Sequence, residues 1–300
     1  MNTMGGCCPC CVVKRRRTGV TLDPWATTPE LTVVLPAYRD AANILSGVAA
    51  VERALHPMGI SFEILLIEDA GGDGADDLIR TLAAVNPRLR FLLHEGNRGR
   101  GATVSEGIRE ARGTLVGFLD IDMEVAAHYI VPMVELLREG QCEMVVACRD
   151  YRVSPDPSFV LRHLLSSSYR RLVRFLLPLP VNDTEAGFKF FRRSSILPVL
   201  DHCRDPRWFW DTEICVRAHR AGLRLLEVPT LFHRRADKGT TVRIFRDSWL
   251  HLRSLLRLRR ELREMASSGQ PSKTAIMSRP TLSTRAAPAS PATLRNPSSS

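Results

Sequence analysis

Apolar runs alternate with amphipathic stretches from residue 31 to about residue 150. Runs rich in Val, Leu and Ile predict strands at 31–35, 62–68, 89–93, 114–119 and 143–148. Apolar residues at helical spacing predict helices between them, at 41–55, 75–85, 102–111 and 125–138. Because each apolar strand is followed by a helix, the pattern predicts an α/β fold whose mostly parallel sheet is covered on both faces.

Polar and glycine-rich residues concentrate where these strands end. The segments are PAYRD, EDAGGDG, HEGNRGRG, DIDME and RDYR. Ligands of open α/β sheets bind outside the carboxyl ends of the strands, so this edge is the predicted ligand site. No Gly-x-Gly-x-x-Gly motif follows the first strand, which counts against a dinucleotide-binding fold and disfavours a sugar-1-phosphate nucleotidyltransferase.

Three acids, Asp120, Asp122 and Glu124, follow the fourth strand at alternate positions. On an extended chain alternate residues share one side, so we expect the three carboxylates to point the same way. Carboxylate oxygens are the ligands that Mg²⁺ and Mn²⁺ prefer, and such a cation would bridge the phosphate oxygens of a departing diphosphate. The alternative is an acidic strand end that caps the following helix.

The other strand ends carry groups that suit a nucleotide. Tyr38 and Asp40 could stack on a base and accept from its ring nitrogens, and an acid such as Asp69 could hold a base or a ribose hydroxyl. The glycine-rich loop with Arg98 and Arg100, placed before a helix, suits a diphosphate. Each segment alone could equally be an ordinary turn, with Asp73 as the N-cap of the helix that follows it.

Composition bounds the folded part and its partners. Of the formal net charge of +10, eight units come from cations in the acid-free stretches before Asp23 and after residue 265, so the body is nearly neutral and no nucleic-acid partner is expected. We expect disordered ends at 1–30 (basic and Cys-rich) and 266–300 (Ser/Pro-rich) around one folded domain at 31–265. Its donor half is about 31–150 and its acceptor half about 151–265.

Cysteine usage and hydropathy indicate the compartment. Four cysteines cluster at Cys7, Cys8, Cys10 and Cys11 without the spacing of a zinc finger, and Cys142, Cys148, Cys203 and Cys215 read as small core residues in a reducing compartment. No run of 18 apolar residues and no secretion signal is seen. We therefore expect a cytoplasmic protein, peripheral at the cytoplasmic membrane face.

The motifs, in their order, resemble the inverting GT-A glycosyltransferases of family 2, and more closely the dolichyl- or polyprenyl-phosphate sugar synthases such as the dolichol-phosphate mannosyltransferases. The matching stretches are VVLPAYRDAANI, EILLIEDAGGDGADD, NRGRGATVSEGIREARGTLVGFLDIDME, NDTEAGFKFFRR and WFWDTEICVRAHRAGLRLLEVP, which span about 31–250. The resemblance implies a GT-A fold, a nucleotide-sugar donor (GDP-mannose or a UDP-sugar), Mg²⁺ or Mn²⁺, and a polyprenyl phosphate acceptor.

The resemblance also implies roles for individual residues. Those expected around the donor are Pro36, Tyr38, Asp40, Asp69, Arg100 and Asp120, with Asp120, Asp122 and Glu124 at the metal and Asp122 as its main ligand. Those expected towards the sugar and acceptor are Asp183, Lys189, Arg192, Asp211 and Glu213, the last two in a stretch where a catalytic base sits in relatives with hydroxyl acceptors. Arg149 is a further candidate for holding phosphate. Lys189 and Arg192 could also be solvated strand residues.

Some positions depart from the family pattern. The first motif ends in Arg39-Asp40 where the family usually has Asn-Glu, and Glu68 stands where an aspartate is usual. The late phosphate-binding lysine is missing, and Arg235, Lys238 and Arg243 remain open as substitutes. A phosphate acceptor is already an anion at neutral pH, because its second pKa is near 6, so it needs cations more than a base.

Two segments bear on the acceptor. At 159–177, Leu161, Leu164, Leu165, Leu172 and Leu176 face one way and Arg162, Arg170 and Arg174 another; at 243–263, Leu252, Leu255, Leu256 and Leu262 oppose Arg246, Arg253, Arg257 and Arg260. Such faces suit an anionic membrane surface, or else a pair of core-packing helices. The sequence thus predicts sugar transfer to a polyprenyl phosphate, with a hydroxyl acceptor or a non-catalytic nucleotide-sugar-binding protein as alternatives.

Overall fold

The computed structural model describes residues 17–19, 28–151, 171, 176–177, 179–233 and 244–267. The strands are β1 (Arg17–Gly19), β2 (Leu31–Ala37), β3 (Phe62–Glu68), β4 (Leu89–Leu93), β5 (Leu115–Leu119), β6 (Met144–Tyr151), β7 (Phe188–Arg192) and β8 (Leu225–Phe232). The α-helices are α1 (Ala41–Leu55), α2 (Ala75–Val85), α3 (Arg100–Glu110), α4 (Ile130–Arg138), α6 (Arg193–Leu200), α7 (Trp210–Arg220) and α8 (Ile244–Ser267). Short 3₁₀ turns lie at His56–Met58 and Ala127–Tyr129.

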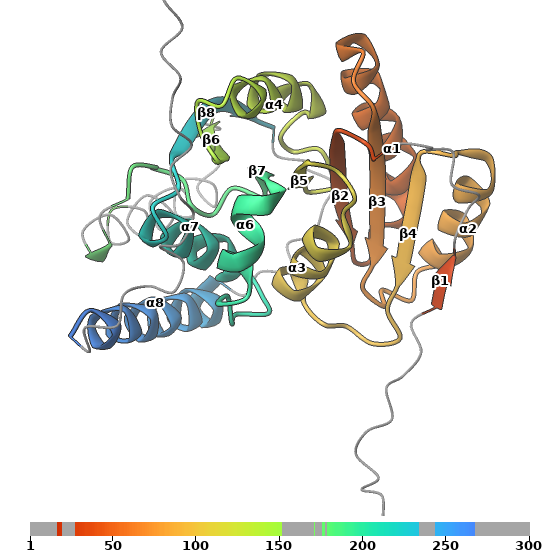
Figure 1. The fold of residues 1–300 in the computed structure, drawn as a ribbon. Coiled ribbons are helices and arrows are strands. Elements are labelled where there is room, and N and C mark those ends of the chain that lie inside the picture. The colour runs from red at the N-terminus through yellow and green to blue at the C-terminus, as the bar shows by residue number, and fades with distance from the viewer. Residues whose placement is uncertain are drawn as a thin grey trace, which may run out of the picture.

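The strands form one sheet in the order β1-β4-β3-β2-β5-β7-β6-β8 (Figure 1). Neighbours β4, β3, β2 and β5 are parallel, as are β6 and β8, whereas β7 runs antiparallel between β5 and β6. The predicted mostly parallel α/β sheet is confirmed. β1 was not predicted: it pairs antiparallel with β4 inside the stretch expected to be disordered.

The order in which the chain adds strands reverses at β2, and this reversal marks where a ligand is expected to bind. From β2 the chain moves outward to β3 and β4, then returns past β2 to β5 on its other side. The carboxyl ends of β2 and β5 therefore lie side by side at a switch point, the position where open α/β sheets bind ligands. The segment before β7 enters the same edge, because the Asp120 amide donates to the Gly187 carbonyl over 3.1 Å.

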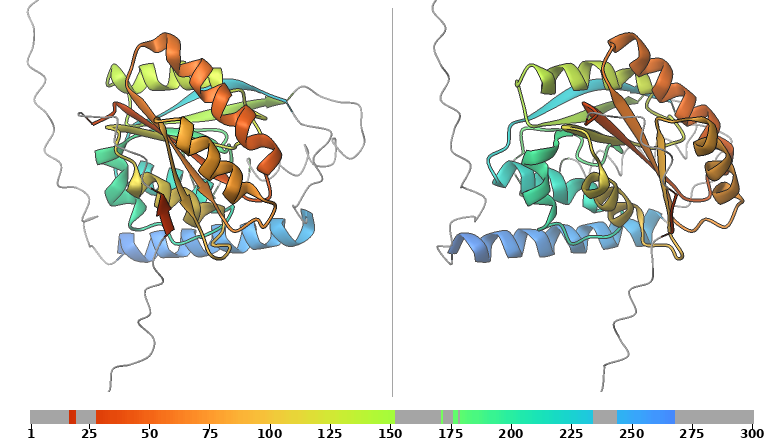
Figure 2. Two further views of the ribbon diagram at one scale, coloured as in Figure 1. Left: turned by 90° about the vertical axis from the view of Figure 1, so that its right-hand side faces the viewer. Right: turned by 45° about the vertical axis from the view of Figure 1, so that its right-hand side comes forward.

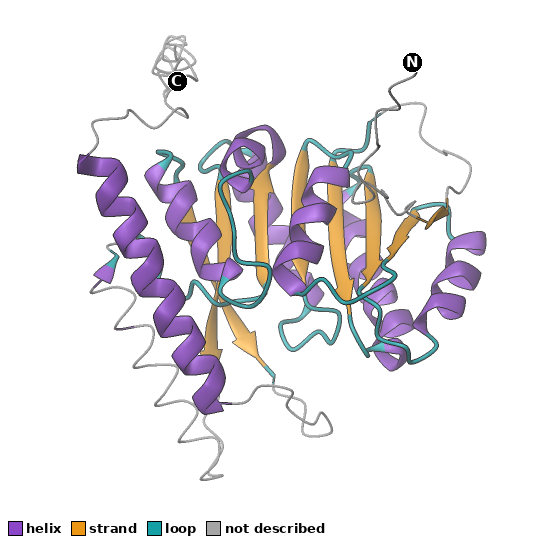
Figure 3. Cartoon of the chain, turned by 90° about the horizontal axis from the view of Figure 1, so that it is seen from below, coloured by secondary structure: helices purple, strands orange, loops and turns teal. Residues whose placement is uncertain are grey.

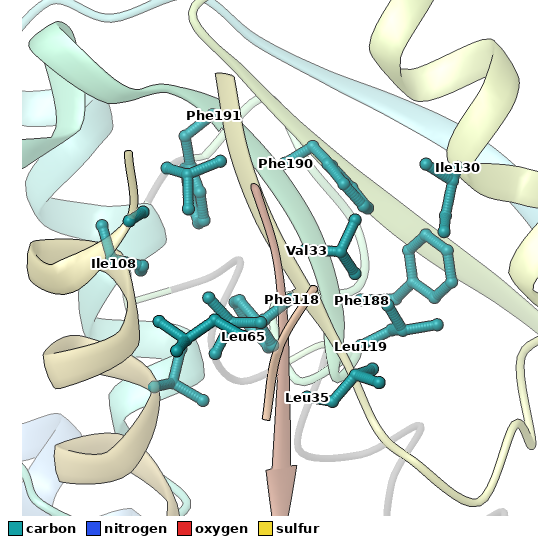
Figure 4. Packing of buried hydrophobic residues seen from close by; sticks show 14 of the residues in the cluster. Val33, Leu35, Leu65, Ile108, Phe118, Leu119, Ile130, Phe188, Phe190 and Phe191 are labelled. Atoms are coloured by element: carbon teal, nitrogen blue, oxygen red, sulfur yellow. The ribbon is translucent and has the colours of Figure 1, made fainter. Parts of the chain in front are cut away.

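Helices cover both faces of the sheet, as Figures 2 and 3 show. Helix α1 contacts α2 and α4, while α6 contacts α3 and α7. In the close-up of the core, Ile108 of α3 and Ile130 of α4 lie on opposite sides of the strands (Figure 4). Phe118, Phe188, Phe190 and Phe191 fill the space between them, all almost fully buried.

Among residues 251–264 of helix α8, whose side chains the structure describes, one apolar face packs against the domain. Leu255, Leu258 and Leu262 are buried against Leu177, Phe209 and Val216, whereas Leu256 is 49% exposed. The alternative of a core-packing helix is therefore correct for this face. The prediction that Leu256 shares a face with Leu255 is wrong. Of the other segment, 159–177, the structure describes only Arg171, Leu176 and Leu177, so the rest of that prediction lies outside the described residues.

Across the described ranges, no helix is long and apolar enough to cross a membrane. Cys142 and Cys215 are buried and Cys148 and Cys203 are partly buried, all as free thiols, which agrees with their interpretation as core residues. Burial raises the pKa of the Cys142 thiol to about 11, so it stays protonated at neutral pH.

Candidate active site

Asp120 is the centre of the predicted site and is held by a buried arginine. It follows β5 directly, and its Oδ1 accepts from Arg100 Nε over 3.0 Å and from Arg100 Nη2 over 2.7 Å. The Asp120 side chain keeps 44% of its surface exposed, whereas that of Arg100 keeps 10%. Asp120 therefore presents a fixed carboxylate to solvent at the switch point.

Arg100 is shared with a second acid behind it. Arg100 Nη1 also donates to Asp211 Oδ2, and Lys189 Nζ donates to Asp211 Oδ1 over 2.6 Å and to the Ala186 carbonyl over 2.5 Å. Lys189 is fully buried and Asp211 is 2% exposed. Four predicted site residues thus form one chain of charges, Asp120–Arg100–Asp211–Lys189, with only Asp120 at the surface.

The three acids after β5 do not line up as an extended strand end. The chain turns at Ile121–Asp122, with the Met123 amide donating to the Asp120 carbonyl over 3.2 Å, and Met123 has a φ of +57°. The turn lies between the three acids, so the argument that alternate residues of an extended chain share one side fails for both Asp122 and Glu124. Within the part of the chain that the structure describes, no three His, Cys, Asp or Glu side chains gather as a metal-binding group.

Asp69 is buried and binds the glycine-rich loop. Its carboxylate accepts from the amides of Arg98 (2.8 Å) and Gly99 (2.9 Å) and from His94 Nδ1 (2.7 Å). His94 Nε2 lies 3.1 Å from Glu106 Oε2. Burial alone would lower the pKa of His94, but the hydrogen bonds to these two carboxylates outweigh it and raise the pKa to about 8.

The end of the glycine-rich loop, from Gly99 into the start of α3, is covered by protein, whereas Glu95–Arg98 are exposed, so the start of α3 is not the open diphosphate cradle that was expected. The Ala102 amide donates to the Pro206 carbonyl over 3.1 Å. A Cβ on Gly99 would lie 2.5 Å from that same oxygen, and a Cβ on Gly101 would lie 2.6 Å from Trp210 Cβ. The start of α3 therefore packs against the segment 205–210, and its glycines are there for close backbone approach.

The second strand end is also structural. Glu68 accepts from the amides of Ala70 (2.7 Å) and Gly71 (2.5 Å), so its carboxylate fixes the turn after β3. Asp73 does not cap α2, whose N-cap is Gly74. It accepts instead from the Ala41 amide over 2.9 Å and so caps α1 across the loop.

The first strand end stays open. Tyr38 is 40% exposed and Pro36 and Asp40 are half-buried, so none of the three is closed off by the core. Asp40 Oδ1 accepts from Asn43 Nδ2 over 3.1 Å. Arg39 lies over the Tyr38 ring, 5.3 Å from its centroid.

In the region predicted to bind the acceptor, Arg149 and Asp183 form a bidentate ion pair. Arg149 Nε and Nη2 donate to the two Asp183 oxygens over 2.7 and 2.9 Å. Glu227 Oε1 accepts from the Asp183 amide over 2.8 Å and so anchors this segment to β8. Asp183 is fully buried, whereas the Arg149 side chain keeps 16% of its surface exposed.

The positions of three further residues differ from those predicted. Arg192 pairs with Leu115 at the start of β5 and donates to the Leu137 carbonyl over 2.7 Å, so it lies at the opposite edge of the sheet. Glu213 binds Arg217 Nε over 2.7 Å and the amides of Arg204 and Asp205, which makes it structural. Lys189 is buried, not solvated. Arg235 lies outside the described residues.

Sequence reasoning missed His94, Glu106 and Trp208. Trp208 is 48% exposed and its ring centroid lies 5.3 Å from the Arg100 guanidinium. The burial of Lys189 could have been predicted from the sequence, because this lysine stands between two phenylalanines in a strand that is buried on both faces. A lysine in such a place requires a buried anion as its partner.

The model of the family described as "Glycosyl transferase family 2" matches residues 32–198. The chain belongs to this family. Among curated relatives, glycosyltransferase AglD of Haloferax volcanii is 32% identical over 222 residues, which are 73% of this chain and 35% of AglD. The dolichyl-phosphate β-glucosyltransferases of Saccharomyces cerevisiae and Dictyostelium discoideum are 23% and 26% identical over 222 and 214 residues.

These matches cover 68% and 66% of this family 2 chain, and 66% and 64% of the two glucosyltransferases, so the chain spans about two thirds of their length. Among solved structures, glucosyl-3-phosphoglycerate synthase of Mycobacterium tuberculosis, in complex with Mg²⁺ and UDP, has a TM-score of 0.55 at 16% identity, over 82% of this chain and 81% of that one. The likeness shows that this chain has the GT-A fold, as predicted.

Proposed function

We propose that this family 2 glycosyltransferase moves a sugar from a nucleotide diphosphate to a polyprenyl phosphate, with inversion. The observation that carries the proposal is the similarity to dolichyl-phosphate β-glucosyltransferases, which continues for more than 210 residues. It therefore extends beyond the donor-side strands into the half that contains Arg149, Asp183 and Asp211.

The donor would lie at the switch point. Tyr38, which is exposed there, would stack on the base with Pro36 and Asp40 beside it, and Asp120 and Asp122 would face the diphosphate. Mg²⁺ in phosphate sites takes one or two protein carboxylates and completes its shell with water and phosphate oxygens, so these two acids fit it without Glu124. When bound, the cation supplies charge neutralisation for the leaving diphosphate.

The acceptor phosphate would react as an anion that is already formed. An acceptor oxygen bonds to the anomeric carbon as the bond from that carbon to the donor diphosphate breaks, and the nucleoside diphosphate leaves with the electron pair. No proton has to be removed, which agrees with the ion pairs that occupy Asp211 and Glu213. Arg149, held rigid by Asp183, is the candidate for binding the acceptor phosphate.

The acceptor would be met at an anionic membrane surface, through the exposed side of α8. Arg253, Arg257, Arg260 and Arg263 are exposed, and so is Leu256. Basic side chains next to an exposed leucine, on the side of the helix away from its buried leucines, suit attraction to lipid headgroups.

A donor screen tests the proposal. Purified protein is incubated with a short polyprenyl phosphate, Mg²⁺ or Mn²⁺, and GDP-mannose or one of several UDP-sugars, and the lipid is analysed by mass spectrometry. We expect a glycosylated polyprenyl phosphate with one donor class, lost in excess chelator and reduced at least about a hundredfold in Asp122→Asn, the loss typical of one key electrostatic group. Failure with every donor would overturn the proposal.

A further inference from the structure

We infer that Asp211 and Lys189 are positioning residues which set, through Arg100, how strongly Asp120 binds the donor's divalent cation. The inference rests on the proposed use of such a cation at the switch point. It replaces the expectation that Asp211 is a catalytic base.

The contacts make Arg100 a shared partner of two acids. One edge of its guanidinium, Nε with Nη2, donates to Asp120, while Nη1 donates to Asp211. Its centre lies 5.3 Å from the centroids of both the Phe118 and the Trp208 rings. Arg100 is held in one orientation by the aromatic rings near its guanidinium and by the carboxylates at two of its edges. A change at Asp211 therefore alters the contact between Arg100 and Asp120.

Lys189 sets the strength of the inner contact. Its ammonium is fully buried and bonds Asp211 Oδ1 and a carbonyl, so Asp211 divides its charge between Lys189 and Arg100. A buried lysine is costly unless it is paired, and here the pairing partner is the acid that also holds Arg100. Two cations and two anions balance, and the most exposed of the four is Asp120, the acid proposed to face the ligand.

The consequence is a set of effects with opposite signs. Asp211→Asn leaves Arg100 with Asp120 as its remaining carboxylate in this chain of charges, so Arg100 competes harder with a cation. Arg100→Gln removes that competition, and Lys189→Met shifts Arg100 towards Asp211. We expect Asp211→Asn to weaken binding of Mn²⁺ about fivefold or more, and the other two variants to strengthen it, since coupling of this size is usual between linked sites.

The test measures free Mn²⁺ by electron paramagnetic resonance in titrations of the full chain, with Mn²⁺ alone and with UDP or GDP present. Glu63→Gln is the matched control, because Glu63 is 1% exposed and paired with Arg90 at the opposite edge of the sheet. It should leave the Mn²⁺ affinity unchanged. No acceptor is used, so the result is separate from that of the donor screen.

A double-mutant cycle separates action through Arg100 from a field that acts through space. We expect Asp211→Asn to change the affinity less than twofold in the Arg100→Gln background. An equal effect in both backgrounds, weakening by all three single variants, or no Mn²⁺ binding by the parent would overturn the inference. The cycle decides the matter even if Lys189→Met does not fold.

Discussion

Asp69 shows how one buried carboxylate can order a whole loop. It holds the amides of Arg98 and Gly99 and the ring of His94, and Glu106 on α3 holds the other side of that ring. Both ring nitrogens can donate only when His94 is protonated. This cluster fixes the loop beside the switch point through the Arg98 and Gly99 amides.

The raised pKa of His94 makes the stability of this cluster depend on pH. The folded-state pKa of about 8 lies above the usual 6.5, so the contribution is complete below pH 6.5 and is lost as pH rises through 8. We expect the free energy of unfolding to fall by about 1 kcal/mol between pH 6.5 and pH 8.5, somewhat less than the full shift would give because the half-exposed Arg98 brings water close.

Denaturant unfolding at several pH values checks this prediction. His94→Gln keeps a polar side chain but cannot gain a proton, so its stability should be flat across the window. His56→Gln is the control, since His56 is exposed, and it should keep the slope of the parent. A parent without a slope, or an unchanged slope in His94→Gln, would contradict the assignment.

At the scale of elements, the sequence predicts best those helices and strands whose buried residues follow a local period. The predicted limits of α1, β3, α2 and β4 agree with the structure, because their apolar residues repeat with a single period. The turn after β5 could not be predicted, since the Met123 amide turns back to the Asp120 carbonyl and Met123 takes a φ of +57°, neither of which an alternating pattern of acids indicates. The pairing of Arg100 with Asp211 was hidden for a similar reason, since the two residues lie 111 positions apart.

Helix α8 gives a direct test of which face packs. Leu255 is fully buried against Phe209 and Val216, and Leu256 beside it is 49% exposed. We expect Leu255→Ala to lower the free energy of unfolding by about 2–4 kcal/mol, as for other buried leucines, and Leu256→Ala to lower it by less than about 0.5 kcal/mol. Equal effects of the two changes, measured by denaturant unfolding, would show that α8 does not pack as described.

At the scale of the whole molecule, the switch point and α8 must serve one reaction if the acceptor is a lipid. Helices α8 and α2 lie at opposite ends of the molecule in Figures 1 and 3. Only the α8 end is therefore proposed to meet the bilayer, with its exposed arginines near the lipid phosphates.

Sedimentation with anionic vesicles tests this orientation. Arg253→Gln with Arg257→Gln should weaken binding about tenfold or more at low salt, since each basic residue near the surface contributes about 1 kcal/mol. The matched pair Arg53→Gln and Arg80→Gln should leave binding unchanged, because both residues are exposed but lie on α1 and α2 and not on α8. Equal losses would indicate attraction by net charge alone.

The most direct test of the account compares a polyprenyl phosphate with the matching polyprenol as acceptors, using the donor identified in the screen. The two lipids differ only in the phosphate, so the comparison isolates the group that the account makes the nucleophile. We predict transfer to the polyprenyl phosphate, with kcat/KM for the polyprenol lower by at least about a thousandfold, because Asp211 and Glu213 are held in ion pairs and do not serve as a base for a hydroxyl. Comparable transfer to the polyprenol would contradict the account.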